Sequence, residues 1–308
     1  MSALSRPEFH NEAKAFEHLE SIVWADGIIC PHCGALDRLT KVTANPEKRI
    51  REGLWRCGHC KGQFTAKIGT VFEHARIPLH KMLQAVYLMT ASKKGVSAHQ
   101  LHRILEVTYK TAWFLAHRVR EAMRSGDLAP FGGAGGIVEV DETFIGIKAG
   151  AEKKRAFHHK MKVLALVDRS TGRSRAMVVD NVSMAHIVPI VRDNIDAETH
   201  VMTDEANQYR YLGEEFAAHD FVSHGRGEYG RGHIHTNTIE GYFSIFKRGM
   251  KGVYQHCGEK HLHRYLAEFD FRYSHRAANG FDDGERSEQA LRGITGKRLT
   301  YSSTGCRA

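Results

Sequence analysis

Two closely spaced cysteine pairs constrain the fold of the N-terminal part of this chain more than any other feature of the sequence. Cys30 and Cys33 form one Cys-x-x-Cys pair, Cys57 and Cys60 form a second, and 23 residues separate the two pairs. Four thiolates in this arrangement supply the closed tetrahedral ligand set that structural zinc prefers. Four buried or redox-active cysteines are the alternative, but they do not explain the doubled spacing. The pattern therefore predicts a zinc ribbon at residues 25–69, with a structural rather than a catalytic ion.

Composition restricts the partner and the compartment. The chain has 308 residues, 42% of them hydrophobic, which is enough for a substantial core and for about two domains. Its net charge of +9 and its pI of about 9.2 indicate a polyanionic partner such as nucleic acid. Six cysteines are too few for a disulfide scaffold, and no apolar run or leader-like segment indicates a membrane span or secretion. We therefore expect a cytoplasmic protein that does not contact a membrane.

Residues 70–127 have the pattern of a helix-turn-helix segment. Ser97 is a candidate N-cap for an apolar-striped helix at 98–105, and a second helix follows a short turn and runs over 110–123. The second helix would be the recognition helix, and an ordinary helical hairpin with a solvated basic face is the alternative. The candidate DNA contacts on it are Lys110, Thr111, His117 and Arg118.

The rest of the chain has the pattern of an α/β domain with short flanking segments. We expect an N-terminal helix within 1–24, a glycine-rich linker at 128–136, an α/β domain at 137–285 and a tail at 286–308. Within the domain, the expected strands are 137–146, 161–168, 174–179, 199–203 and 219–223, and the expected helices are 183–195 and a region from about 236.

Two aspartates in this domain are candidate metal ligands. Period-two alternation places Asp141 on the polar face of its strand, whose other face carries apolar residues. Asp204 lies at the end of a later strand. A buried carboxylate is costly unless a cation compensates its charge. The alternatives are a solvated strand face for Asp141 and a helix N-cap for Asp204.

The helix from residue 236 provides a third candidate. Asn237, Glu240, Ser244 and Lys247 recur at steps of three and four, so they share one face of the helix, opposite an apolar face. Glu240 could instead be a capping-box carboxylate behind Asn237. If it is a ligand, Glu240 and Lys247 present a metal-binding and a phosphate-binding group along one line.

The order of these elements is that of the RNase H-like fold. The order begins with the strand of Asp141, which a two-strand hairpin and a helix follow. Next come a strand ending at Asp204, another strand and the helix with Glu240. Three carboxylates suit Mg²⁺ or Mn²⁺, and two such ions can clamp the attacking and leaving oxygens of a phosphodiester exchange. The predicted fold class is therefore a multi-domain α/β protein with a zinc ribbon, a helix-turn-helix segment and an RNase H-like mixed sheet.

The sequence resembles bacterial insertion-sequence transposases that join a zinc ribbon to a DDE-type RNase H-like domain. The resemblance covers roughly residues 8–280. Its carriers are Cys-Pro-His-Cys-Gly (30–34), Trp-Arg-Cys-Gly-His-Cys (55–60), Lys-Thr-Ala-Trp-Phe (110–114), Val-Asp-Glu-Thr-Phe-Ile-Gly (140–146), Thr-Asp-Glu (203–205), His-Thr-Asn-Thr-Ile-Glu-Gly-Tyr-Phe-Ser-Ile-Phe-Lys-Arg (235–248) and Arg-Tyr-Leu-Ala-Glu-Phe-Asp-Phe-Arg-Tyr (264–273).

This resemblance implies a set of roles. Asp141 and Asp204 would be catalytic carboxylates, the third member would be Glu240 or Asn237, with Glu240 favoured for its charge, and Lys247 would contact DNA. Apart from the resemblance, Arg226 and Arg231 belong to a flexible basic loop at residues 224–233 that is a candidate DNA contact, with simple surface flexibility as the alternative, and Arg248 is a further candidate contact.

By the same resemblance, the protein would bind terminal inverted repeats, cleave DNA and join the freed 3′-hydroxyl to a target. It would act near the bacterial nucleoid, as a homodimer or a larger assembly in the synaptic complex. A catalytically silent DNA-binding regulator and an RNase H-like nuclease without strand transfer are the rival functions.

Overall fold

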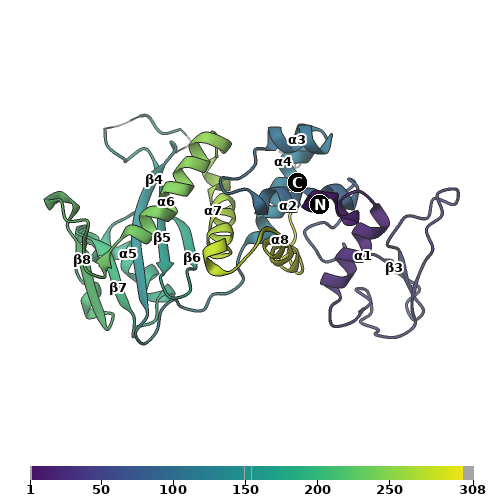
Figure 1. Ribbon diagram of the computed structural model, residues 1–308, viewed down its shortest axis with the longest axis horizontal. Coiled ribbons are helices and arrows are strands. Elements are labelled where there is room, and N and C mark those ends of the chain that lie inside the picture. Colours follow the sequence, from purple (N-terminus) through teal and green to yellow (C-terminus); the bar gives the residue numbers. More distant parts are fainter. Residues whose placement is uncertain (1, 149, 154, 301–308) are drawn as a thin grey trace, which may run out of the picture. The chain divides into compact units, whose positions relative to one another are not determined.

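The computed structural model describes residues 2–148, 150–153 and 155–300, and Figure 1 shows its helices and strands. The chain divides into two compact units. Residues 1–123 and 282–308 make up the first unit, and residues 124–281 make up the second. Each unit is described by itself below.

The zinc-ribbon part of the first unit is a small antiparallel sheet preceded by a helix. The strands β1 (Leu39–Lys41), β2 (Trp55–Cys57) and β3 (Gln63–Phe64) pair in that order. The preceding helix α1 spans Glu12–Val23, and the Asn11 side chain caps it by accepting a hydrogen bond from the backbone N–H of Lys14. Residues 7–9, which lie within the range expected for this helix, form a separate 3-10 turn.

The further α-helices in the described residues of the first unit are α2 (Leu79–Ala91), α3 (Ala98–Leu105), α4 (Tyr109–Met123) and α8 (Asp283–Arg292). The expected N-cap is confirmed, because the Ser97 hydroxyl accepts a hydrogen bond from the Gln100 N–H. The turn between α3 and α4 begins at Glu106, which has a left-handed backbone conformation. Residues 286–308 were expected to form a tail, but residues 286–292 belong to α8. This helix starts with a capping box formed by Asp282 and Glu285.

The second unit is built on a five-stranded mixed sheet in the order β6-β5-β4-β7-β8. β5 pairs antiparallel with both β4 and β6, whereas β7 runs parallel to both β4 and β8. The strands are β4 (Ile137–Ile145), β5 (Met161–Asp168), β6 (Ser174–Val179), β7 (His200–Asp204) and β8 (Ala218–Val222). These ranges confirm the five expected strands to within one residue at each end.

Helices cover both faces of this sheet. Alternate residues of β5 divide between two cores, because successive side chains of a strand point to opposite faces. Leu164 and Leu166 pack with α5 (Met184–Asn194), whereas Val163 and Ala165 pack with α6 (Asn237–Gly249) and α7 (Glu259–Ser274). The buried residues of α6 include Ile239, Tyr242, Phe243 and Phe246, which confirms the expected apolar face of this helix. A short ribbon of β9 (Gly230–Arg231) and β10 (Ile234–His235) precedes α6, and a π-helical turn (Met250–Tyr254) follows it.

A partly buried aspartate in α7 holds α6 in place on the sheet. The Tyr242 hydroxyl in α6 donates to Asp270 Oδ1 over 2.8 Å, and the Ala176 N–H in β6 donates to Asp270 Oδ2 over 2.8 Å. These contacts attach the helix that carries Glu240 to both its neighbouring helix and the sheet.

The strand order and the two helical layers are those of an RNase H-like domain, so the predicted fold class is confirmed. None of the helices in the described ranges is long and apolar enough to cross a membrane.

Candidate active site and metal centre

The four cysteines of the two pairs come together in the first unit. Their sulfur atoms all lie within 4.8 Å of one another, with Cys30 to Cys60 and Cys33 to Cys57 each at 3.7 Å. Four sulfurs placed tetrahedrally around zinc at about 2.3 Å are separated by about 3.8 Å. Backbone N–H groups of Cys60 and His59 point at the Cys57 sulfur and lower the pKa of its thiol to about 6. The cluster therefore fits a zinc ion in both geometry and donor chemistry.

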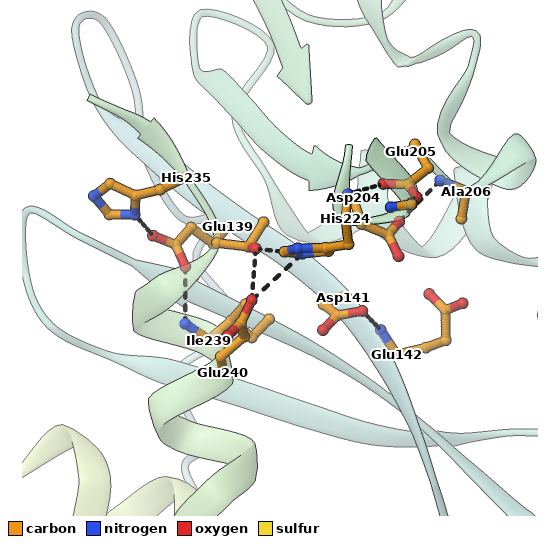
Figure 2. A network of polar contacts seen from close by, with 12 residues as sticks. Glu139, Asp141, Glu142, Asp204, Glu205, Ala206, His224, His235, Ile239 and Glu240 are labelled. Atoms are coloured by element: carbon orange, nitrogen blue, oxygen red, sulfur yellow. Dashed lines mark hydrogen bonds and ion pairs between the residues drawn. The ribbon is translucent and has the colours of Figure 1, made fainter. Parts of the chain in front are cut away.

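Asp141 and Asp204 lie at matching positions on adjacent parallel strands of the second unit. In the register of β4 and β7, Glu139 is paired with Met202. Continuing this register by two residues brings Asp141 beside Asp204. Both belong to the sheet face that α6 covers, because their strand neighbours Val140 and Thr203 point the other way. Figure 2 shows the two carboxylates together with Glu240.

Negative charge is in excess at this position. Burial, followed by the charges of Glu142 and Asp204, raises the pKa of Asp141 to about 8. Burial likewise raises the pKa of Asp204. Among the residues that the structure describes, neither aspartate has a cationic group within 4.0 Å. A divalent cation would relieve this repulsion, so the donor set fits Mg²⁺ or Mn²⁺ chemically.

The structure does not assemble all three candidate carboxylates as tightly as the cysteines. Within the described part of the chain, the cysteine set is the one group of three or more His, Cys, Asp or Glu whose ligand atoms all lie within 4.8 Å of one another. The fit of the acidic site to a metal therefore depends on charge and donor type, with Asp141 and Asp204 as the close pair.

Glu240 lies in the first turn of α6. Its Oε1 accepts a hydrogen bond from the Thr236 hydroxyl at 3.1 Å and lies 3.4 Å from Nε2 of His224 (Figure 2). The capping-box alternative is wrong, because Thr236 rather than Asn237 is the N-cap and its side chain makes no capping hydrogen bond. Asn237 is the first residue of α6, and its exposed side chain has no hydrogen-bond partner among the described residues.

The His224 ring belongs to a loop that Glu205 anchors. The Glu205 carboxylate accepts hydrogen bonds from the N–H groups of His224 and Gly225, at 2.6 and 2.7 Å. These two bonds lower the pKa of Glu205. The residue after Asp204 therefore fixes the loop that carries His224 toward Glu240. Sequence reasoning missed this role for His224, since nothing local shows where a loop histidine points.

Glu142 was also missed by sequence reasoning as a contributor to the site. It follows Asp141 in β4, so its side chain points to the opposite face. There it accepts hydrogen bonds from the Tyr209 hydroxyl and from the Gln208 side chain. Burial raises the pKa of Glu142. The doubled acidic pair at 141–142 is the signal that could have identified it.

Glu139 connects the strand of Asp141 to the helix of Glu240. Its side chain is fully buried, and its carboxylate accepts hydrogen bonds from Arg169 Nε at 2.5 Å and from the Ile239 N–H at 2.8 Å. The His235 ring lies 3.3 Å from the same carboxylate (Figure 2). A carboxylate at a helix N-terminus is electrostatically favourable. The two-residue spacing of Glu139 and Asp141 shows from the sequence that both lie on one strand face. The sequence does not show the partner of Glu139 in α6, because Ile239 is a hundred residues away.

Lys247 and Arg248 lie two turns further along α6. The Lys247 ammonium is exposed and lies 5.8 Å from the centre of the Phe243 ring. Its positive charge opposes the raised pKa of Asp141, so it is close enough to act on the acidic site. The exposed Arg248 donates from Nε to the Ser244 carbonyl within the helix.

The other candidate DNA contacts divide into exposed and buried side chains. Lys110 is exposed and Thr111 partly so at the start of α4, whereas His117 and Arg118 are only 1% and 8% exposed. Burial removes these two side chains from the open surface of α4, although Arg118 still lines a cavity beside this helix. In the loop before α6, Arg226 and Arg231 are exposed, and Arg231 pairs with Glu228 at 2.9 Å.

The fold and the two sites define a protein that joins a four-cysteine zinc ribbon to an RNase H-like domain with an acidic centre. Residues 10–63 match the transposase zinc-ribbon domain, and residues 133–274 match the ISXO2-like transposase domain. The chain belongs to this family of insertion-sequence transposases.

Two relatives are consistent with this membership. The chain is 30% identical over 287 residues to an uncharacterized protein in transposable element ISH50 of Halobacterium salinarum, covering 86% of this chain and 91% of that protein. It is 26% identical over 98 residues to an uncharacterized transposase-like protein of Haemophilus influenzae, covering 32% of this chain and 78% of that protein.

Among solved structures, the chain is similar to a chain in the cryo-EM structure of a simian T-cell lymphotropic virus intasome with PP2A regulatory subunit B56 gamma. It is 13% identical at a TM-score of 0.29, and the match covers 55% of this chain and 67% of that one.

Proposed function

We propose that this protein binds the terminal inverted repeats of its insertion sequence, cleaves DNA strands at them and transfers the freed 3′-hydroxyl into target DNA. Family membership supports a transposase. The observation that carries the chemistry is the adjacent pair Asp141 and Asp204, whose pKa values are raised first by burial and then by the negative charge of nearby carboxylates. Burying two adjacent carboxylates lowers the stability of a folded protein, so such pairs are typical of functional sites.

We propose that Asp141, Asp204 and Glu240 hold the divalent ions, with Asn237 as the alternative third member. When bound, Mg²⁺ or Mn²⁺ ions supply electrostatic stabilisation of the attacking and leaving oxygens of a phosphodiester. In the first unit, Cys30, Cys33, Cys57 and Cys60 would hold a structural zinc.

The chain's own side chains would orient the DNA around this centre. Lys247 lies on the exposed face of α6 with Glu240, where its ammonium can contact a phosphate near the scissile bond. Arg226, Arg231 and Arg248 add exposed positive charge on the neighbouring loop and helix. His224, 3.4 Å from Glu240, is placed to orient that carboxylate.

The partner, the oligomeric state and the place of action follow from DNA as the substrate. We propose that the partner is duplex DNA, both element ends and target, and that the protein acts as a homodimer or a larger assembly that brings two ends together. The place of action would be the bacterial nucleoid. The silent regulator is less well supported, because none of the acidic candidates is missing from this chain.

Substitution of the acidic pair tests the proposal. Asp141→Asn and Asp204→Asn keep the side-chain shape but remove charge from the centre. Strand cleavage and joining on an element-end duplex should fall by about a hundredfold to a thousandfold or more, with affinity for that duplex nearly unchanged. The matched control is Asp193→Asn, an exposed position on α5. Wild-type cleavage by Asp141→Asn would refute the mechanism, and cleavage without joining by the wild-type protein would favour the nuclease.

A further inference from the structure

Two cavities in the first unit share the loop of residues 74–77, which leads into α2. One, of about 260 Å³, also borders the first turns of α4, and the other, of about 600 Å³, borders α1 and residues 51–52. All four loop residues line both cavities. We call the combined depression the loop-74 groove.

Positive charge exceeds negative charge in the lining of the loop-74 groove. Of its two carboxylates, Glu12 is already engaged, because it accepts hydrogen bonds from the N–H groups of Leu79 and His80 at the start of α2. Glu52 is the other. Five lysine and arginine side chains line the same groove: Arg51, Lys67, Arg76, Lys110 and Arg118.

Two arginines among these cations are accessible to a ligand. Arg51 and Arg76 are exposed, and neither side chain makes an ion pair or a hydrogen bond with any other residue that the structure describes. Guanidinium groups in such a setting suit phosphate, which they can bind through two parallel N–H groups.

Two further cations of the lining are less accessible, Arg118 being buried and Lys67 partly buried. Arg118, 8% exposed, donates from Nη1 to the Glu73 carbonyl at 2.9 Å, but its buried Nε has no acceptor in the described part of the chain. Lys67 donates to the Ala75 carbonyl at 3.0 Å. Burial, and then the charges of Arg51 and Arg118, lower the pKa of Lys67. An anion in the groove would relieve this repulsion and provide an acceptor for the buried donor.

The remaining surface of the groove suits the sugar part of a nucleic-acid backbone. Its walls include the apolar side chains of Phe16, Ile77, Phe114 and Leu115. Lys110 and Thr111 add the N-terminal turn of α4, where the helix dipole favours negative charge.

We infer that the loop-74 groove binds the sugar–phosphate backbone of duplex DNA, with Arg51 and Arg76 as its accessible phosphate contacts. The inference rests on the proposed function, because it assigns a binding surface for the DNA that the second unit would cleave. It adds residues 51, 67 and 74–77, which lie outside the ribbon cysteines and the recognition helix, to the DNA-binding surface.

The test uses the full-length, zinc-loaded protein with the double substitution Arg51→Gln and Arg76→Gln. Affinity for a short duplex of arbitrary sequence is measured at several salt concentrations, since backbone contacts do not depend on sequence. The variant should bind on the order of tenfold more weakly at low salt. Its log–log salt slope should become shallower by about 0.9 for each phosphate that the protein no longer neutralises. Thermal unfolding should match the wild type, because both side chains are exposed and make no ion pair with the described residues.

The matched control is Arg6→Gln with Arg292→Gln, which removes the same charge from exposed positions of the first unit outside the groove. This control should keep the wild-type salt slope. An unchanged affinity and slope in the groove variant, or an equal weakening in the control, would overturn the inference while leaving the proposed function intact. Failure of the wild-type protein to bind any duplex would count against the proposed function itself.

Discussion

The backbone N–H of Ile239 in α6 donates a 2.8 Å hydrogen bond to the buried carboxylate of Glu139 in β4. Glu139 lies two residues before Asp141 on the same strand face, and Ile239 directly precedes Glu240. One contact therefore links the strand that carries one candidate ligand to the helix that carries another. Arg169 neutralises the Glu139 charge through a 2.5 Å contact, so Glu139 is a positioning residue rather than a metal ligand.

Glu139→Ala should destabilise the protein strongly. It leaves the Nε of Arg169, in a side chain only 15% exposed, and the Ile239 N–H without their acceptor, while the other guanidinium nitrogens still donate to the His233 and His235 carbonyls. Removing one partner of a buried pair typically costs about 3–5 kcal/mol. The free energy of unfolding, measured by urea denaturation, checks this value, and Glu139→Gln should recover part of the stability because its amide oxygen can still accept from Ile239. Glu198→Ala, at an exposed position of the same unit, should change stability by no more than about 0.5 kcal/mol.

The stability of the protein without added magnesium or manganese should depend on the ionisation of Asp141. Its pKa is raised from 3.8 to about 8, so the folded state binds this proton more tightly than the unfolded state does. The contribution of Asp141 to stability is therefore present below about pH 4 and is lost as the pH rises toward about 8. Asp141→Asn should be more stable than the wild type near pH 8 and similar to it near pH 4.

Denaturation curves at the two pH values check this difference. Added magnesium should stabilise the wild type near pH 8, because it binds the ionised site of the folded state, and should stabilise Asp141→Asn less. A wild type that is as stable as the variant across the whole range would show that Asp141 ionises normally.

Two substitutions on α6 distinguish the candidates for the third ligand. Glu240→Gln should reduce strand cleavage by about a hundredfold to a thousandfold, since it removes a negative charge beside the proposed ions. Asn237→Ala should retain cleavage within a few-fold, because no hydrogen bond from the described residues orients its exposed amide toward the site. Cleavage rates at saturating metal decide between them, and the reverse result would assign the role to Asn237. Ser244→Ala, exposed on the same helix face, is the control.

The four-cysteine cluster should bind one zinc per chain. The double substitution Cys57→Ser and Cys60→Ser removes two of four ligands, and zinc binding is coupled to folding of such a small sheet. The variant should lose its zinc by elemental analysis, and protease should cut within residues 25–69. Replacing Cys257, which lies outside the cluster, with Ser should leave the zinc content at one. Full zinc retention by the double variant would exclude these ligands.

The sequence alone determined those features that depend on local periodicity and spacing. The five strands of the central sheet and helix α5 were located to within one residue, because alternation along a strand and the helical repeat are properties of neighbouring residues. The two faces of α6 and the Ser97 cap were predictable for the same reason. The two cysteine pairs identified their own cluster, because the ligand spacing of a zinc ribbon is contained in the chain.

Tertiary structure alone decided the features that depend on strand pairing and burial. The parallel register of β4 and β7 brings Asp141 beside Asp204, and burial together with nearby negative charge raises their pKa values. The contact between Glu139 and Ile239 joins positions a hundred residues apart. Packing also buried His117, which its position on a basic helix suggested would be exposed. These outcomes are non-local, because each depends on which segments the folded chain places next to one another.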